Sequence, residues 1–375
     1  MGNLAALVPV ALFLAFAVGL SVVVRHRTQS ASDGGGFVKE YFIGNRGLGG
    51  FVLAMTTIAT YGSVSSFVGG PGQAWSIGFG WVYMAVVQVT ALVLLYGIVG
   101  KKMALIARKL DAITVADVIR ARYGSNALAN LSAAIVVVFF GATMIAQFVG
   151  GAKLFEAVTG YSYVFGLVLF GVAVILFTTI GGFRGVALTD ALCGIAIIGP
   201  VAASISTVSS LLISSSSALV KDVWMHYAEA RGRRMGERAL SVSSQAVTLG
   251  LGAVVFVLAV VPPDVIWKIN MFAFGGLETA FFWVMVCGLF WRRANRTGAL
   301  WSMAGGMLAY CATMALGFKV ADLHQIVIGI VVAGVCMVAG SLAGKQAPAS
   351  RMEVFFPDCD SGAEAANGSS ARRAG

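Results

Sequence analysis

The sequence predicts an all-α polytopic membrane protein, and three observations carry that prediction. Hydrophobic residues make up 58% of the 375 residues and charged residues only 11%. The mean hydropathy is +0.88, so a soluble domain of this length could not bury its apolar surface. The chain also carries 47 glycines and no apolar/polar alternation of period two. This composition favours closely packed helices over a membrane barrel.

Ten apolar spans supply the expected membrane helices. The first is kept as an anchor helix, because it is long for a signal peptide and lacks a small-residue cleavage site. After Lys345 the sequence turns polar, which predicts a transmembrane domain over 1–345 and a disordered cytoplasmic tail over 346–375. The spans are 4–24, 48–70, 76–100, 126–149, 160–181, 187–220, 240–262, 266–291, 298–318 and 324–343.

Lysine and arginine residues predict the orientation of these spans. All 26 lie outside the apolar centres, so the net charge of +10 concerns topology rather than a nucleic-acid partner. If the first helix runs inward, only Lys153, Lys268 and Lys319 face outside. The basic connection 101–125 fits either an interfacial helix on anionic headgroups or a solvated loop.

The span 187–220 does not fit this orientation as a single crossing. Arg184 precedes it and the basic segment 221–239 follows it, and both are expected inside, so the span must cross an even number of times. One helix of about 33 residues would be about 50 Å long, whereas two crossings need about 40 residues. Gly199-Pro200 near the middle predicts a helix break. A re-entrant pair of half-helices, a frustrated topology and the loss of an odd number of spans all remain open.

A polar stretch inside an apolar span, residues 54–72, predicts a solute or ion site. It reads AMTTIATYGSVSSFVGGPG, and its hydroxyls, its central Gly62 and its GGPG end predict a discontinuous helix whose freed carbonyls face an ion or solute. A Ser/Thr packing face between neighbouring helices is the alternative. A second hydroxyl cluster extends from Ser204 to Ser217. Neutral oxygens of this kind suit a weakly bound monovalent cation better than Mg²⁺ or Ca²⁺.

Acidic residues at membrane depth are few. Glu278 lies about twelve residues into its span and is either a functional group or a protonated structural carboxyl beside Thr279. Asp190 is expected to form a helix-end or gate ion pair, with Arg184 nearby. The sequence shows no nucleophile elbow, phosphate-binding loop or HExxH motif, and its five cysteines and three histidines are dispersed. We therefore expect neither an enzyme nor a bound cofactor.

Several runs of sequence together resemble the sodium/solute symporter family. The resemblance covers nearly all of residues 3–345 and implies a leucine-transporter-like fold, with two inverted five-helix repeats that each open with a broken helix. It implies Na⁺-coupled symport of a small carboxylate, with pantothenate as the expected solute, across a bacterial inner membrane and with a cytoplasmic C-terminus. The runs are EYFIGNRGLGGFVLAMTTIATYGSVSSFVGGPGQAWSIGFGWV, GKKMALIARKLDAITVADVIRARYG, AQFVGGAKLFEAVTG, TTIGGFRGVALTD, ASISTVSSLLISSSSALVKDVW and INMFAFGGLETAFFWVMVCGLFWRRANRTGAL.

The resemblance also implies site residues. The family's sodium site uses two carbonyls of the broken helix, then a carbonyl and two hydroxyls in an A-x-x-S-T pattern. The matching positions are Ala59, Gly62, Ala203, Ser206 and Thr207. The solute would contact the other side of the break, at Tyr61, Ser63, Ser65 and Ser66, with Glu278 as a further candidate.

One departure from the family pattern concerns the join at Gly199-Pro200. In the family three spans separate GGFRGVALTD from A-x-x-S-T, whereas here the two motifs share one span. We therefore expect an internal deletion near 199–200 and an incomplete second repeat, and the charge pattern also allows the loss of an odd number of spans. Two other functions stay open. The chain could be a non-transporting remnant or membrane interaction subunit, or a sodium symporter for another solute such as proline or a monocarboxylate.

Overall fold

The computed structural model describes residues 3–29, 36–196, 200–232, 235–261, 266–320 and 323–356. Within these ranges the regular structure is helical, with one isolated bridge between Val320 and Leu323. In this described part of the chain, eight helices are long and apolar enough to cross a membrane, and a bent pair would make a ninth. The all-α membrane prediction is therefore confirmed.

The helices follow the expected apolar spans, except that the helix over 163–196 continues from the span 160–181 into the span 187–220. In chain order they are α1 (Leu4–Gln29), α2 (Phe37–Ile43), η1 (Gly44–Arg46), α3 (Gly50–Tyr61), η2 (Ser65–Gly69), α4 (Gly70–Ile77), α5 (Phe79–Leu94), η3 (Leu95–Gly100), α6 (Lys101–Lys109), α7 (Val115–Tyr123), α8 (Asn126–Thr159), α9 (Tyr163–Ala196), α10 (Pro200–Ser217), η4 (Ala218–Met225), α11 (His226–Ala230), α12 (Glu237–Val260), α13 (Ile266–Phe290), α14 (Arg296–Ala315), α15 (Ile326–Ala343) and α16 (Ala349–Phe355).

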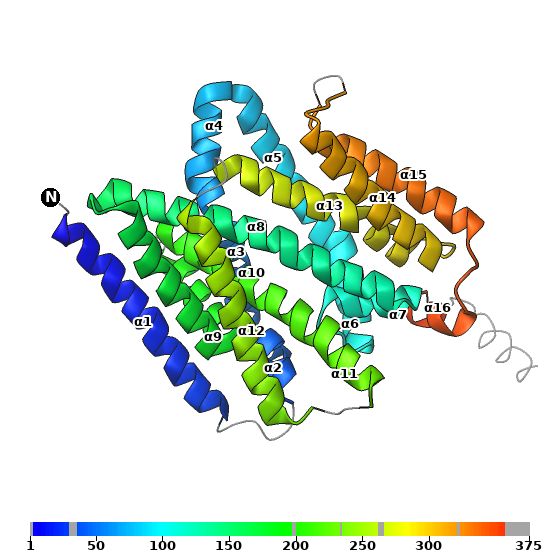
Figure 1. Ribbon diagram of the computed structural model, residues 1–375, viewed down its shortest axis with the longest axis horizontal. Helices are drawn as coiled ribbons and strands as arrows, with labels where there is room; N and C mark the ends of the chain where they lie inside the picture. Colours follow the sequence, from blue (N-terminus) through cyan, green and yellow to red (C-terminus); the bar gives the residue numbers. More distant parts are fainter. Residues whose placement is uncertain are drawn as a thin grey trace, which may run out of the picture. The chain divides into compact units, whose positions relative to one another are not determined.

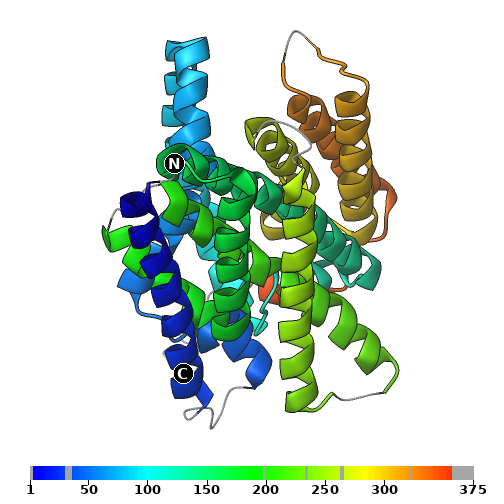
Figure 2. The same ribbon diagram turned by 60° about the vertical axis from the view of Figure 1, so that its left-hand side comes forward.

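The chain forms two compact units. The first comprises Met1–Leu92 and Asn130–Glu278, and the second Val93–Ala129 and Thr279–Gly375. In the first unit α9 is central, because α1, α2, α3, α10 and α12 all pack against it (Figure 1). Figure 2 shows α4 and the start of α5 standing out from these helices. In the second unit α14 and α15 pair along their length, and α16 packs on α6 and α7 (Figure 1).

The polar stretch 54–72 is broken once, after α3. Gly62 takes an extended conformation with φ −68° and ψ 111°, and the helix that resumes at Ser65 is bent by 52° from α3. The predicted discontinuous helix is thereby confirmed. The GGPG end, in contrast, stays helical. Pro71 lies in the first turn of α4, where a missing N–H is tolerated.

The helix α9 consists of two segments joined at Gly182. This glycine has φ 53°, and a Cβ there would lie 2.8 Å from the Tyr41 ring, so the kink needs a residue without a side chain. Just after the kink, Arg184 pairs with Glu40 of α2 at 2.8 Å. The expectation that Arg184 pairs with Asp190 is therefore wrong. The guanidinium reaches the neighbouring helix instead.

The span 187–220 is built as two helical segments rather than one long helix. The first ends with α9 at Ala196, and the second, α10, begins at Pro200 and packs against α9. Gly199, at which a break was expected, lies outside the described residues. These segments belong to two longer candidate membrane spans, Tyr163–Cys193 and Ala202–Ala230, so the choice among the three alternatives stays open.

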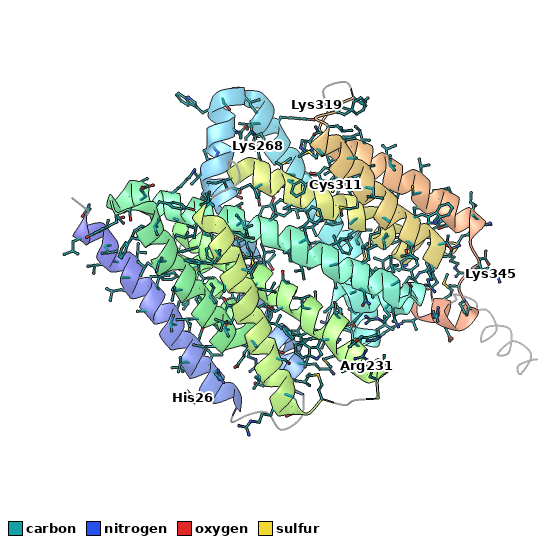
Figure 3. All side chains as sticks on the ribbon, in the orientation of Figure 1. His26, Arg231, Lys268, Cys311, Lys319 and Lys345 are labelled. Atoms are coloured by element: carbon teal, nitrogen blue, oxygen red, sulfur yellow. The ribbon has the colours of Figure 1, made fainter. Side chains whose placement is uncertain are left out.

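Charged side chains at the helix ends can be followed in Figure 3. In the first unit, His26 at the end of α1 and Arg231 after α11 lie at the end opposite to Lys268. In the second unit, Lys319 and Lys345 lie at opposite ends of the α14–α15 pair. Within each unit, the labelled lysine that is expected outside, Lys268 or Lys319, is thus separated from a labelled basic residue that is expected inside, Arg231 or Lys345.

Part of the tail differs from the expected disorder. Residues 349–355 form α16, whose Phe355 is 2% exposed and packs with Ile106, Val118 and Leu289. Burial of this aromatic ring stabilises the helix by roughly 2 kcal/mol. The polar composition after Lys345 gave no sign of this helix. The rest of the expected tail, 357–375, lies outside the described residues.

Candidate functional site

Three helices of the first unit meet at the end of α3. On α10, Ala203, Ser206, Thr207 and Ser210 are spaced three and four residues apart, so they share one helix face. That face packs against α3 and α9. Hydroxyl groups that would gain nothing from contact with lipid are therefore collected between helices.

The Thr207 hydroxyl lies among three backbone carbonyls. Its Oγ1 is 3.0 Å from Thr60 O, 3.4 Å from Gly62 O and 3.0 Å from Ala203 O. The break frees Thr60 O, because the amide four residues later, Val64 N, donates elsewhere. One hydroxyl carries a single hydrogen, so it can satisfy only one of the three carbonyls at a time. The site is short of hydrogen-bond donors, and a cation would supply the missing positive charge.

A buried carboxylate adjoins these carbonyls. Asp190 of α9 is 0% exposed, and its Oδ2 accepts hydrogen bonds of 3.4 Å from Thr60 Oγ1 and from Ser210 Oγ. Its Oδ1 and the buried Ser206 Oγ have no hydrogen-bond partner in the described part of the chain. A carboxylate at membrane depth needs compensation. We refer to Thr60, Gly62, Ala203, Ser206, Thr207 and Asp190 as the α3/α10 cluster.

The five residues assigned to a sodium site are placed as follows. Gly62, Ala203 and Thr207 meet directly, and Ser206 shares the buried face of α10. Ala59 lies in the last turn of α3, but the α3 carbonyl that Thr207 contacts is the next one, that of Thr60. Sodium binding by these residues remains a prediction.

Sequence reasoning missed the position of Asp190. The residue was assigned to an ion pair because Arg184 is close to it in sequence. The available signal was an acid with apolar residues on both sides, in VALTDALCG, because such a residue in a membrane helix faces other protein groups.

The other side of the break holds a second group of polar contacts. Val64 N donates to Gln147 Oε1 of α8 at 3.0 Å, and Asn270 Nδ2 of α13 donates to Ser65 Oγ at 2.9 Å. The Ser63 and Ser66 hydroxyls are 3.4 Å apart. Gln147 is 0% exposed and Asn270 is 6% exposed. We refer to Gln147 and Asn270 as the amide pair.

Each member of the amide pair has one buried atom without a partner. These atoms are Gln147 Nε2 and Asn270 Oδ1 among the described residues. Close packing brings α8 to this position, since a Cβ on Gly150 would lie 2.4 Å from Val64 Cγ1. Neither amide was predicted. Each stands alone in an apolar span, as in MIAQFVGG and KINMFAF, and an isolated amide gives no periodic pattern.

The predicted solute residues are only partly collected at the break. Ser63 is buried and Ser65 half-buried, whereas Ser66 and Tyr61 are exposed. Glu278 also has an exposed side chain, and it lies eight residues, or about 12 Å, along α13 from Asn270. The structure does not bring Glu278 to the break, and its role in solute binding stays a prediction.

The comparisons with known proteins identify a transporter family. The model of the Sodium:solute symporter family matches residues 41–201 and 192–306. Sodium/pantothenate symporters from Haemophilus influenzae and Escherichia coli are 30% and 28% identical, over 92% of this chain and 97% and 98% of those proteins. A sodium/proline symporter from Staphylococcus aureus is 32% identical over 43% of this chain and 32% of that protein.

A solved structure shares the fold. A Na⁺-coupled sialic acid symporter, in a substrate-bound outward-open state, matches with a TM-score of 0.70 and 14% identity, over 90% of this chain and 97% of that one. The alignment with the Haemophilus relative spans 477 positions, more than the 375 residues of this chain. The relative therefore has internal residues without a counterpart here. The two matches of the family model overlap at residues 192–201.

Proposed function

The chain belongs to the sodium:solute symporter family, and we propose that it imports pantothenate together with Na⁺, using the α3/α10 cluster as its ion site. Sodium-coupled solute transport is the activity of its relatives. They are transporters and not enzymes, and Na⁺ is their coupling ion. Pantothenate is favoured because its symporters match over 97% and 98% of their length, whereas the proline symporter matches over 32%.

The shortage of hydrogen-bond donors in the α3/α10 cluster supports the choice of ion. The carbonyls of Thr60 and Gly62 share the single hydroxyl hydrogen of Thr207, whereas Ala203 O also accepts the Thr207 amide within α10. A monovalent cation there is surrounded by neutral oxygens, with one carboxylate, that of Asp190, to balance its charge. The described residues include no group of three or more His, Cys, Asp and Glu that could hold a metal. In this proposal Na⁺ joins the end of α3 to α10, and its release weakens that contact and opens the inward path.

The solute then occupies the other side of the break, beside Ser63 and Ser65. Both groups of contacts belong to one broken helix, so the ion and the solute act on the same backbone. Tyr61, Ser66 and Glu278 are exposed here and would reach the solute only after a rearrangement.

The proposal includes an internal deletion between α9 and α10. The meeting of the two family matches at 192–201 supports a position near 199–200, and the even number of crossings required by Arg184 and 221–239 supports the loss of an odd number of spans. The second inverted repeat is then incomplete. Residues 1–345 form the transmembrane domain, and the C-terminus is cytoplasmic.

Uptake of labelled pantothenate tests the function. Cells expressing the chain are compared with and without a sodium gradient, and membrane insertion is quantified in parallel. We expect saturable, sodium-dependent uptake, and its loss in Ser206→Ala and Thr207→Ala at unchanged insertion. Normal insertion without any uptake would instead favour the non-transporting remnant. Uptake that excess proline suppresses and excess pantothenate does not would point to another solute.

A further inference from the structure

The amide pair is the most informative group of atoms that the proposed function leaves unused. Gln147 Oε1 accepts from Val64 N, and a backbone N–H can only donate, so the Gln147 NH₂ group is the one left over. Asn270 gives its Nδ2 to Ser65 Oγ, which leaves Oδ1. The two leftovers have opposite character, since one is a donor and the other an acceptor.

The two side chains contact adjacent positions of the broken helix. These positions are the consecutive residues Val64 and Ser65, whose Cα atoms are about 3.8 Å apart. Both side chains are more than nine-tenths buried. Leaving such groups unpaired is unfavourable, and polar side chains that persist in this state at a helix break are candidates to bind a ligand.

We propose that Gln147 and Asn270 together bind a secondary amide of the solute, so that the site selects a carboxylic acid with an internal amide. The solute carbonyl accepts from Gln147 Nε2, and the solute N–H donates to Asn270 Oδ1. Pantothenate has one such amide between its hydroxylated part and its carboxylate, whereas proline and simple monocarboxylates lack it. This inference rests on the proposed function and adds the specificity determinant.

A matched pair of ligands tests the inference. The full-length chain in proteoliposomes is titrated with labelled pantothenate in sodium, and with the ester analogue in which oxygen replaces the amide N–H. The parent should bind the ester about tenfold more weakly, because Asn270 Oδ1 is left facing an oxygen. Asn270→Ala should bind the two ligands about equally, because its affinity for pantothenate falls while its affinity for the ester does not.

Two further variants separate the roles of the pair. Gln147→Glu keeps an oxygen for Val64 N and removes the donor, so both ligands should weaken equally and the tenfold preference should persist. Asn270→Asp keeps an acceptor oxygen at this position, so the tenfold preference for pantothenate over the ester should persist. This variant allows the test to be made if Asn270→Ala fails to insert. Asn130→Ala, at an exposed position of α8, is the control and should change neither affinity nor preference.

The outcomes distinguish the inference from the function on which it rests. If the parent binds pantothenate in sodium but shows no preference over the ester, or if Asn270→Ala retains the tenfold preference, the amide pair does not bind the solute amide. If the parent shows no sodium-dependent binding of pantothenate, the proposed function is refuted and the inference falls with it.

Discussion

Thr207→Val gives the sharpest test of the α3/α10 cluster. The change keeps the shape of the side chain and removes the hydroxyl that reaches the carbonyls of Thr60, Gly62 and Ala203. A bound Na⁺ loses one oxygen ligand. Interactions between a neutral group and a charge contribute about 1.5 to 3 kcal/mol, so sodium affinity should fall by roughly 10- to 150-fold.

Thermal unfolding of the purified chain measures this loss. NaCl is exchanged for choline chloride at constant ionic strength, and the sodium concentration that gives half of the stabilisation is recorded. At a concentration 100 times the dissociation constant, the parent gains about 2.7 kcal/mol from the ion. The variant, at the same concentration, should gain only about 0.3 to 1.4 kcal/mol, for affinities about 150-fold to tenfold weaker.

Two control variants make the result interpretable. Thr207→Ser keeps the hydroxyl and should keep the sodium midpoint close to that of the parent. Thr57→Val removes an exposed hydroxyl on α3, one that donates to Leu53 O at 2.8 Å, and should leave the midpoint unchanged. A Thr207→Val chain with the parent's sodium midpoint would show that this hydroxyl is not an ion ligand.

Two further predictions concern packing. Gly150→Ala should destabilise the chain by about 1 to 3 kcal/mol in thermal unfolding and weaken solute binding, because its Cβ would lie 2.4 Å from Val64 Cγ1. Gly141→Ala is the control on α8, since nothing lies within 4 Å of its new Cβ, and it should be neutral or slightly stabilising. Equal effects of the two substitutions would contradict the close approach of Gly150 to Val64. Phe355→Ala should lower the free energy of unfolding of α16 by about 3 kcal/mol and release the helix. Trypsin should then cleave faster after Arg351, while the stabilisation by sodium stays unchanged. An unchanged cleavage rate would mean that the buried ring does not hold the helix.

Local chemistry explains what the sequence could predict. The break at Gly62 follows from a glycine between hydroxyl residues in an apolar span, and the face formed by Ala203, Ser206 and Thr207 follows from helical spacing. The GGPG motif misled for an equally local reason. Proline disrupts a helix interior but is tolerated in a first turn, and Pro71 occupies a first turn.

The missing parts of the site depend on which helices are neighbours. Asp190, Gln147 and Asn270 come from α9, α8 and α13. Each contacts a residue of the broken helix that is between 83 and 205 residues away in sequence. No periodicity within one helix encodes such a pairing. Only the general rule that a lone polar residue in a membrane helix faces protein could have selected them.

The second segment of α9 is a short helix that contacts two neighbouring helices through polar side chains. Near one end Arg184 is tied to Glu40 of α2, and six residues later, about 9 Å along the axis, Asp190 is tied to Thr60. A helix of this length does not stretch, so the two attachments cannot shift independently. Any tilt that follows a change at the end of α3 is carried directly to α2, with no intervening relay of side chains.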